Sequence, residues 1–142
     1  MDIEQLTQEL NQLHIDHAKI FSMAANSFAS FGETGVMLWL SCQQDEVFAV
    51  DIIEHFGITA GRVANIIKKL EERGYLSRKH NYVDLRKSNI RLTESGAAYA
   101  AGLYERMNAN HLQIIKALGE EDASQALLIL KKIITYFENN PQ

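Results

Sequence analysis

The sequence has a single cysteine, a single proline and no long hydrophobic run. The one cysteine, Cys42, can form neither an internal disulfide nor a multi-cysteine zinc site. The one proline, Pro141, stands next to the last residue, so proline interrupts no helix in the body of the chain. No apolar run approaches the roughly 20 residues that a bilayer-crossing helix needs. The acidic start, MDIEQLTQEL, does not have the form of a signal peptide, and a cytoplasmic protein is therefore expected.

The length and composition are those of one ordinary globular domain. The chain has 142 residues, of which 46% are hydrophobic and 23% are charged. An intrinsically disordered chain would be much poorer in apolar residues. Because one domain usually takes roughly 100–200 residues, we expect a single domain over residues 1–142.

The charge is distributed very unevenly along the chain. The formal net charge is −4, which taken alone argues against a nucleic-acid partner. Residues 59–91, however, contain nine basic and three acidic side chains, so this window carries +6 while the remainder carries −10. A basic patch within an acidic protein is typical of a local surface that binds a polyanion.

The hydrophobic pattern predicts a mostly α-helical fold. Apolar residues recur at spacings of three and four, and glycines separate the periodic segments. The expected helices cover residues 2–28, 33–42, 48–56, 60–73, 94–118 and 120–137. A short β-hairpin with a basic tip is expected between strands over 75–78 and 89–92. The first helix is longer than a small domain needs, which suggests that its apolar stripe packs against another subunit.

Two of the expected helices have the sequence form of a helix-turn-helix. Helices 48–56 and 60–73 are joined through Gly57, at a position that favours a left-handed residue, and Thr59 is the predicted N-cap of the second helix. In such a pair the second helix can enter the major groove of DNA, and a basic hairpin that follows it acts as a wing. The sequence therefore predicts a winged helix-turn-helix module over residues 33–92.

A series of motifs in this region resembles the signature of the multiple-antibiotic-resistance-regulator (MarR) family. The motifs are Leu70-Glu71-Glu72-Arg73-Gly74-Tyr75-Leu76, Asp84-x-Arg86 and Leu92-Thr93-x-x-Gly96. The resemblance covers nearly the whole chain and implies a homodimeric winged-helix transcription factor, with dimerisation helices in residues 1–30 and 94–142. It also implies that Asp84 steadies the wing and that Arg86 enters the minor groove.

The start of the expected recognition helix departs from that family. Many members have Ser and Thr followed by Arg there, whereas this chain has Gly61-Arg62-Val63-Ala64-Asn65. The operator preference of the family therefore does not carry over. We expect Arg62 and Asn65 to contact bases, because Arg can bind guanine and Asn adenine through paired hydrogen bonds. The complete set of expected DNA-binding residues is Thr59, Ala60, Gly61, Arg62, Asn65, Lys68, Lys69, Arg78, Lys79, Asp84, Arg86 and Lys87.

The function expected from these features is transcriptional regulation by a homodimer that binds double-stranded DNA. The direction expected is repression at a pseudo-palindromic operator, with release by a small-molecule effector left open. An effector would bind in a crevice between the dimerisation helices and the winged module. The residues expected near such a ligand are His17, Phe28, Phe31, Met37 and Trp39.

Other chemistry has little support in the sequence. No phosphate-binding Gly-rich loop, G-x-S-x-G or H-E-x-x-H motif is present, so neither an enzyme nor a cofactor is expected. Whether His14, His17 and His111 bind a metal stays open, and Cys42 is expected to be buried. The alternatives are a helical interaction module whose basic patch meets an acidic partner, and a metal-sensing regulator of the same fold.

Overall fold

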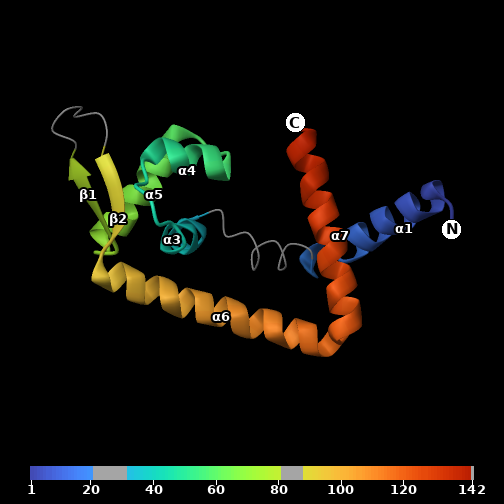
Figure 1. Cartoon of the computed structure of the whole chain (residues 1–142). Coiled ribbons are helices and arrows are strands. Elements are labelled where there is room, and N and C mark those ends of the chain that lie inside the picture. Colours follow the sequence, from blue (N-terminus) through green and yellow to red (C-terminus); the bar gives the residue numbers. More distant parts are fainter. Residues whose placement is uncertain (21–31, 81–87, 142) are drawn as a thin grey trace. The chain divides into compact units, whose positions relative to one another are not determined.

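A computed structural model describes residues 1–20, 32–80 and 88–141 of the chain (Figure 1). Its helices and strands are α1 (Ile3–Asp16), α3 (Glu33–Ser41), α4 (Ala49–Phe56), α5 (Ala60–Glu72), β1 (Leu76–His80), β2 (Ser88–Leu92), α6 (Glu94–Leu118) and α7 (Glu120–Asn139). The expected mostly α-helical fold with a small β-hairpin is therefore confirmed. The chain divides into two compact units, residues 1–103 and 104–142.

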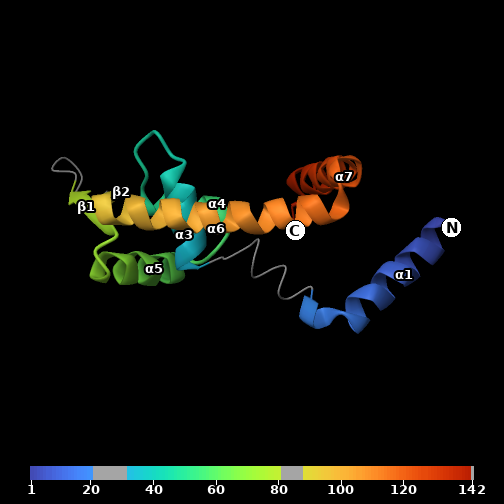
Figure 2. The same cartoon turned by 90° about the horizontal axis from the view of Figure 1, so that it is seen from below.

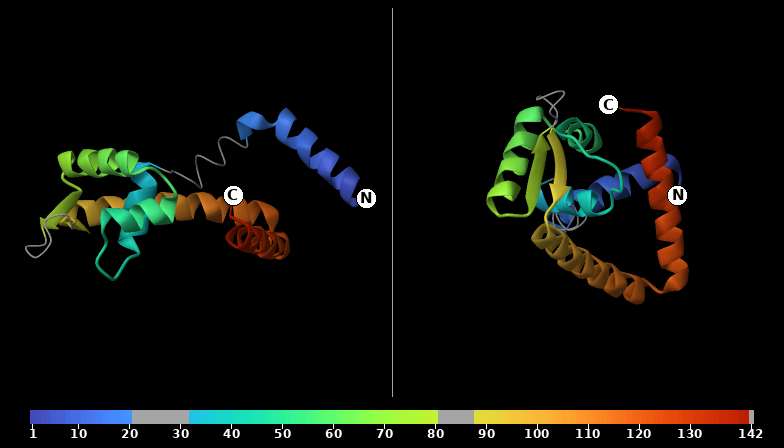
Figure 3. Two further views of the ribbon diagram at one scale, coloured as in Figure 1. Left: turned by 90° about the horizontal axis from the view of Figure 1, so that it is seen from above. Right: turned by 60° about the vertical axis from the view of Figure 1, so that its left-hand side comes forward.

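The core of the first unit lies among α3, α4, α5, the hairpin and the first turns of α6. Figure 2 shows α3 and α5 from below, and the right-hand view of Figure 3 shows β1 and β2 beside α5. The buried apolar side chains are Val36, Met37, Leu40, Val47, Ile52, Val63, Ile66, Ile67, Leu70, Leu76, Ile90, Ala100 and Leu103. Helix α5 thus buries one stripe against this interior and leaves its other face to solvent, whereas α3 is buried or half-buried from Glu33 to Leu40.

The hairpin is joined to the helices by one additional pairing. Strands β1 and β2 pair antiparallel, with Leu76 opposite Leu92 and His80 opposite Ser88. Val47, in the connection before α4, forms an isolated bridge with Ile90, whose backbone N–H donates to the Val47 carbonyl at 2.8 Å. This bridge ties β2 to the connection between α3 and α4.

The first helix differs from the expected span of residues 2–28. Helix α1 begins after Asp2, whose carboxylate accepts from the backbone of Gln5, and it ends at Asp16. His17 leaves the helical region at φ −120° and ψ 30°, so the expected single helix is interrupted there. The part of that helix beyond residue 20 lies outside the described residues.

The second unit contains the C-terminal part of α6 and the whole of α7. Gly119 separates these helices with φ 85°, a left-handed value that glycine adopts without steric penalty. None of the described residues of α7 is buried within this chain. Among the described residues, no helix combines the length and the hydropathy that a membrane-spanning segment requires. That residues 1–142 act as one domain stays a prediction.

Candidate nucleic-acid interface

The N-terminus of α5 is built as the sequence predicts. Gly57 follows α4 with φ 61°, and Thr59 occupies the N-cap with its Oγ1 accepting from the backbone N–H of Arg62 at 3.2 Å. Thr59, Ala60 and Gly61 are exposed. A β-carbon added at Gly61 would meet no atom within 4 Å, so packing within the chain does not require glycine there. The first turn of α5 therefore presents backbone amides and very little side-chain bulk, which suits close approach to an anion.

The two faces of α5 are chemically opposite. Its buried residues are Val63, Ile66, Ile67 and Leu70, as the helical spacing predicts. The exposed residues expected to bind DNA are Arg62, Asn65, Lys68 and Lys69. Since the apolar stripe fixes the rotation of the helix against the core, these four side chains are directed to solvent from one rigid element.

Arg78 is held within the protein by an ion pair. Its Nη2 and Nε both lie 2.6 Å from Oε1 of Glu71, so the side chain connects β1 to the last turns of α5. This partner neutralises much of the charge that Arg78 was expected to offer to DNA. Lys79, the next residue of β1, is exposed. The remaining expected contacts in the wing, Asp84, Arg86 and Lys87, lie outside the described residues.

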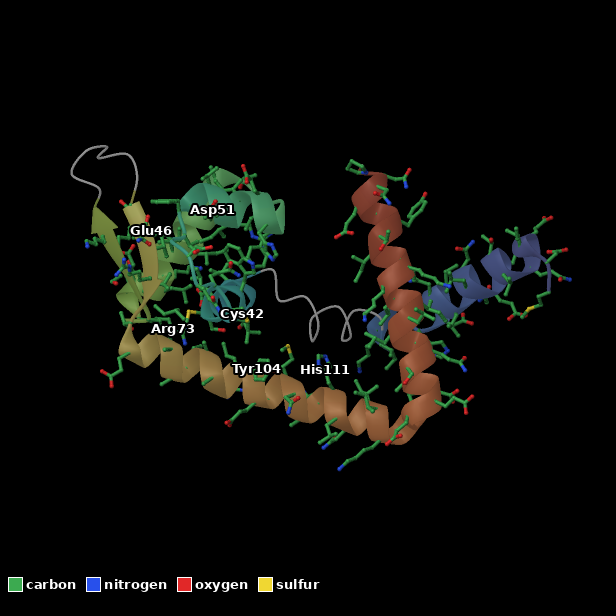
Figure 4. The ribbon with its side chains drawn as sticks, in the orientation of Figure 1. Cys42, Glu46, Asp51, Arg73, Tyr104 and His111 are labelled. Atoms are coloured by element: carbon green, nitrogen blue, oxygen red, sulfur yellow. The ribbon has the colours of Figure 1, made fainter. Side chains whose placement is uncertain are left out.

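Arg73 occupies a cluster that the sequence did not reveal. Its Nη1 lies 3.0 Å from Oε2 of Glu33, and its guanidinium carbon stands 4.9 Å from the ring centre of Tyr75 and 5.4 Å from that of Tyr99. The two tyrosine rings are stacked, with centroids 4.4 Å apart. A hydrogen bond with Tyr99 is the largest cause that raises the pKa of Arg73, against a smaller lowering by desolvation. Figure 4 shows Arg73 near the junction of the hairpin and α6.

The motif residues between α5 and α6 form a compact junction. The Thr93 hydroxyl donates to the carbonyl oxygen of Gly74 at 2.6 Å and accepts from the backbone N–H of Gly96 at 3.0 Å. The backbone N–H of Thr93 donates to the carbonyl of Tyr75 at 3.0 Å. These hydrogen bonds fix the start of α6 against the entry to β1. The Leu92-Thr93-x-x-Gly96 motif therefore has a structural reason in this chain, independent of any DNA contact.

The residues expected near an effector fall in different environments. Met37 is fully buried in the core, whereas His17 is exposed at the end of α1. Trp39 is half-buried and stacks on His55, with ring centroids 4.6 Å apart. Phe28 and Phe31 lie outside the described residues. The effector site itself stays a prediction.

Cys42 and the histidines are the remaining residues that the sequence analysis considered. The expectation that Cys42 is buried is wrong: α3 ends at Ser41, and Cys42 is exposed at the C-cap (Figure 4). Within the described residues, no group of three or more histidine, cysteine or acidic side chains could hold a metal ion.

Comparisons with known proteins agree with this geometry. Residues 33–88 match the model of the MarR family. An uncharacterized HTH-type transcriptional regulator of Bacillus subtilis, YfiV, is 31% identical over 68 residues, which cover 48% of this chain and 41% of that protein. The chain thus matches less than half the length of this curated relative.

Solved structures share the fold over nearly the whole chain. The Streptococcus pneumoniae FabT structure, in complex with DNA, has a TM-score of 0.70 at 18% identity and covers 97% of this chain and 99% of that one. A Staphylococcus aureus MepR–DNA complex has a TM-score of 0.65 at 23% identity, covering 96% and 98%. Residues 33–88 thus match the MarR family, and the chain shares the winged-helix fold of these solved structures.

Proposed function

We propose that the chain is a sequence-specific DNA-binding transcriptional regulator that works as a homodimer. The observation that carries this proposal is the exposed face of α5, with a capped, uncrowded N-terminus followed by Arg62, Asn65, Lys68 and Lys69. A helix of this kind fits the major groove with its first residues at base edges. Two structures with this fold, those of FabT and MepR, are complexes with DNA, and this supports the proposal that the chain binds DNA.

The side chains of α5 divide by their chemistry into two roles. Arg62 and Asn65 lie in the first two turns and can make paired hydrogen bonds to guanine and adenine, so they are the proposed base contacts. Lys68 and Lys69 lie further along the helix and are proposed phosphate contacts, which raise affinity without selecting a sequence. The N-terminal amides of α5 are proposed to face a phosphate, because a helix N-terminus carries a partial positive charge.

The proposal of a homodimer is supported by apolar side chains that this chain leaves uncovered. In α7, Leu127, Leu130, Ile134 and Phe137 are each more than half exposed, and α1 exposes Leu6, Leu10 and Leu13 to a similar degree. Contiguous apolar surface of this kind marks an interaction site. A second copy of the chain is the proposed occupant, because two-fold pairing presents the same patch to itself and also supplies two DNA-reading helices. The two half-sites would then lie about one helical turn, roughly 10 base pairs, apart.

Selection of bound duplexes from a random pool tests this proposal directly. We expect enrichment of an inverted repeat, because a two-fold dimer reads both half-sites alike. Binding to the selected duplex should weaken steeply with salt, since cations are released from DNA on binding. If no sequence is enriched and binding to random duplex is independent of salt, the proposal fails and an interaction module for an acidic protein is favoured.

Repression is the proposed direction of regulation, with release by a small molecule. A dimer that binds an operator overlapping a promoter blocks transcription from that promoter. Expression of a reporter gene placed downstream of the selected operator should therefore fall when the chain is expressed. A ligand that binds the folded protein raises its melting temperature. A reporter that gains output instead would identify an activator.

A further inference from the structure

Arg73 contacts three parts of the winged module from one position (Figure 4). It is the C-cap of α5, and its Nη1 lies 3.0 Å from Oε2 of Glu33, the first residue of α3. Its guanidinium carbon lies 4.9 Å from the ring centre of Tyr75, which precedes β1, and 5.4 Å from that of Tyr99 in α6. All four residues belong to the first compact unit. One side chain therefore contacts α3, the entry to β1 and α6 at the point where α5 ends.

The connection that carries Arg73 decides how the hairpin leaves α5. Residues 73–75 alone separate α5 from β1. The backbone N–H of Gly74 donates to the carbonyl of Glu71, and that of Tyr75 donates to the carbonyl of Leu70, both at 2.9 Å. With Gly74 at φ 78°, this is the Schellman form of a helix end. Because the connection is so short, a change in a few of its backbone angles would rotate the hairpin relative to α5.

The two tyrosine rings provide the surface on which the guanidinium of Arg73 lies. The rings of Tyr75 and Tyr99 are stacked, with centroids 4.4 Å apart and planes 11° apart. A guanidinium is planar, and its positive charge is attracted to the face of an aromatic ring. Its hydrogen bond with the Tyr99 side chain raises the pKa of Arg73. The rings and the Glu33 carboxylate together hold the guanidinium in one place.

These contacts lie outside the hydrophobic core. The side chain of Arg73 is 44% exposed and that of Glu33 is 31% exposed, and neither residue belongs to the buried cluster. Ion pairs with this exposure contribute little to the stability of a fold. The contacts of Arg73 are therefore better suited to orienting the elements that they join than to keeping the chain folded.

We propose that Arg73 is a positioning residue for DNA binding, which fixes the hairpin relative to α5. This inference rests on the proposed function, in which both elements contact one duplex. Lys68 on α5 and Lys79 on β1 are exposed, and fixing their spacing in advance avoids an ordering cost when both bind phosphates of that duplex. In this role Arg73 acts through Glu33 and the two rings, and it does not itself bind a phosphate.

Residual dipolar couplings of the ¹⁵N-labelled full chain test the orientation without DNA. They measure the direction of β1 and β2 relative to α5. In Arg73→Met the couplings of the hairpin should change or shrink, while those of α3, α4 and α5 still fit one rigid body. Arg106→Met removes an exposed arginine on α6 with the same change in charge, and it should leave the couplings of the hairpin as they are. Unchanged hairpin couplings in Arg73→Met would overturn the proposal.

Affinity for the selected operator distinguishes positioning from a direct contact with DNA. Glu33→Gln removes the carboxylate that holds Arg73, so operator affinity should fall about threefold or more. If Arg73 instead bound a phosphate, release from Glu33 would raise the affinity. Glu54→Gln makes the same change in charge at an exposed position of α4 and should not lower the affinity. A rise in affinity with Glu33→Gln, or a fall of the same size in both variants, overturns the proposal.

Paired variants give a result that a loss of stability alone would not produce. In the parent chain, Lys79→Ala and Lys68→Ala should each weaken operator binding. In the Arg73→Met chain, Lys79→Ala should have little further effect because the hairpin is no longer held in place, whereas Lys68→Ala should keep its full effect. Equal effects of Lys79→Ala in the two chains overturn the proposal. A parent chain that binds no duplex contradicts the proposed function, whereas unchanged dipolar couplings contradict only the role of Arg73.

Discussion

Gly96 lies so close to the carbonyl group of Tyr75 that a β-carbon at position 96 would overlap its oxygen. The contact joins the first turn of α6 to the residue that precedes β1, and the Thr93 hydrogen bonds hold the same two segments together. The atoms of Tyr75 that would be overlapped belong to the backbone, so they cannot rotate away as the end of a flexible side chain could. Glycine at this position is thus required by packing alone.

Gly96→Ala should therefore destabilise the protein. Overpacking of a close contact costs about 1–3 kcal/mol, which exceeds the gain of up to about 1 kcal/mol from the higher helix propensity of alanine. Urea unfolding followed by circular dichroism measures the difference. Gly102→Ala is the matched control, because it lies on the same helix and a β-carbon there meets nothing within 4 Å. Equal stability of the two variants would contradict the packing argument.

The helix-turn-helix could be predicted from the sequence because its determinants are local. Thr59 caps the helix that follows it, and the stripe from Val63 to Leu70 fixes which face is buried. These features operate within a few residues, and the expected helix over 60–73 differs from α5 by one residue. The amphipathic pattern also separates the exposed basic residues from the core without any knowledge of tertiary contacts.

The features that escaped prediction depend on residues far apart in the chain. Arg73 pairs with Glu33 and stands over Tyr99, and neither partner is near it in sequence. The bridge between Val47 and Ile90 involves a single residue on one side, so it leaves no alternating pattern to detect. The exposure of Cys42 at the C-cap of α3 also escaped prediction, because hydrophobic periodicity does not show which residues at a helix end are covered by other segments.

Glu71→Gln should release Arg78 and thereby strengthen binding to non-specific DNA. The variant removes the carboxylate that lies 2.6 Å from the guanidinium, so Arg78 becomes available to a phosphate. Loss of this partly exposed pair should lower the free energy of unfolding by no more than about 1 kcal/mol. Fluorescence anisotropy with a random duplex at several salt concentrations should give a salt slope steeper by up to about one unit.

Glu72→Gln controls for the change in net charge. It lies next to Glu71 and is exposed, and it makes the same charge change as Glu71→Gln. If both variants alter affinity and salt slope equally, the effect is general electrostatics and Arg78 has no separate role in binding.

The apolar face of α7 is expected to control assembly. Leu130→Glu combined with Ile134→Glu places two charges on residues that are more than half exposed in the single chain. If a partner covers this face, burying those charges would be prohibitive, so sedimentation should show monomers or unfolded chain instead of dimers. Trp39 lies in the winged module, and its fluorescence distinguishes a folded monomer from an unfolded chain. Gln125→Glu, on the same helix, is the control. A folded monomer of the parent chain at micromolar concentration would end the dimer hypothesis.

Arg86→Ala tests the role that the family resemblance implies for the wing. If Arg86 enters a minor groove, its loss should weaken binding most for operators with A·T-rich flanks, where the narrow groove has the most negative potential. Lys87→Ala should weaken all sequences alike, because a phosphate contact does not read bases. Titration of operators with A·T-rich and G·C-rich flanks separates the two outcomes. Affinity of Arg86→Ala within about twofold of the parent on both operators would exclude the minor-groove contact.

Gly61→Ala is expected to lower the affinity for the operator without lowering the stability of the fold. A β-carbon at this exposed position meets no atom of the chain within 4 Å, and alanine favours helix over glycine, so stability should stay level or rise by up to about 1 kcal/mol. The added methyl group would nevertheless stand at the helix start that we propose faces the DNA backbone. Operator affinity should therefore fall while the melting temperature does not. Gly102→Ala adds the same group on α6 and should leave operator affinity unchanged. Undiminished affinity of Gly61→Ala would mean that the first turn of α5 does not approach the DNA closely.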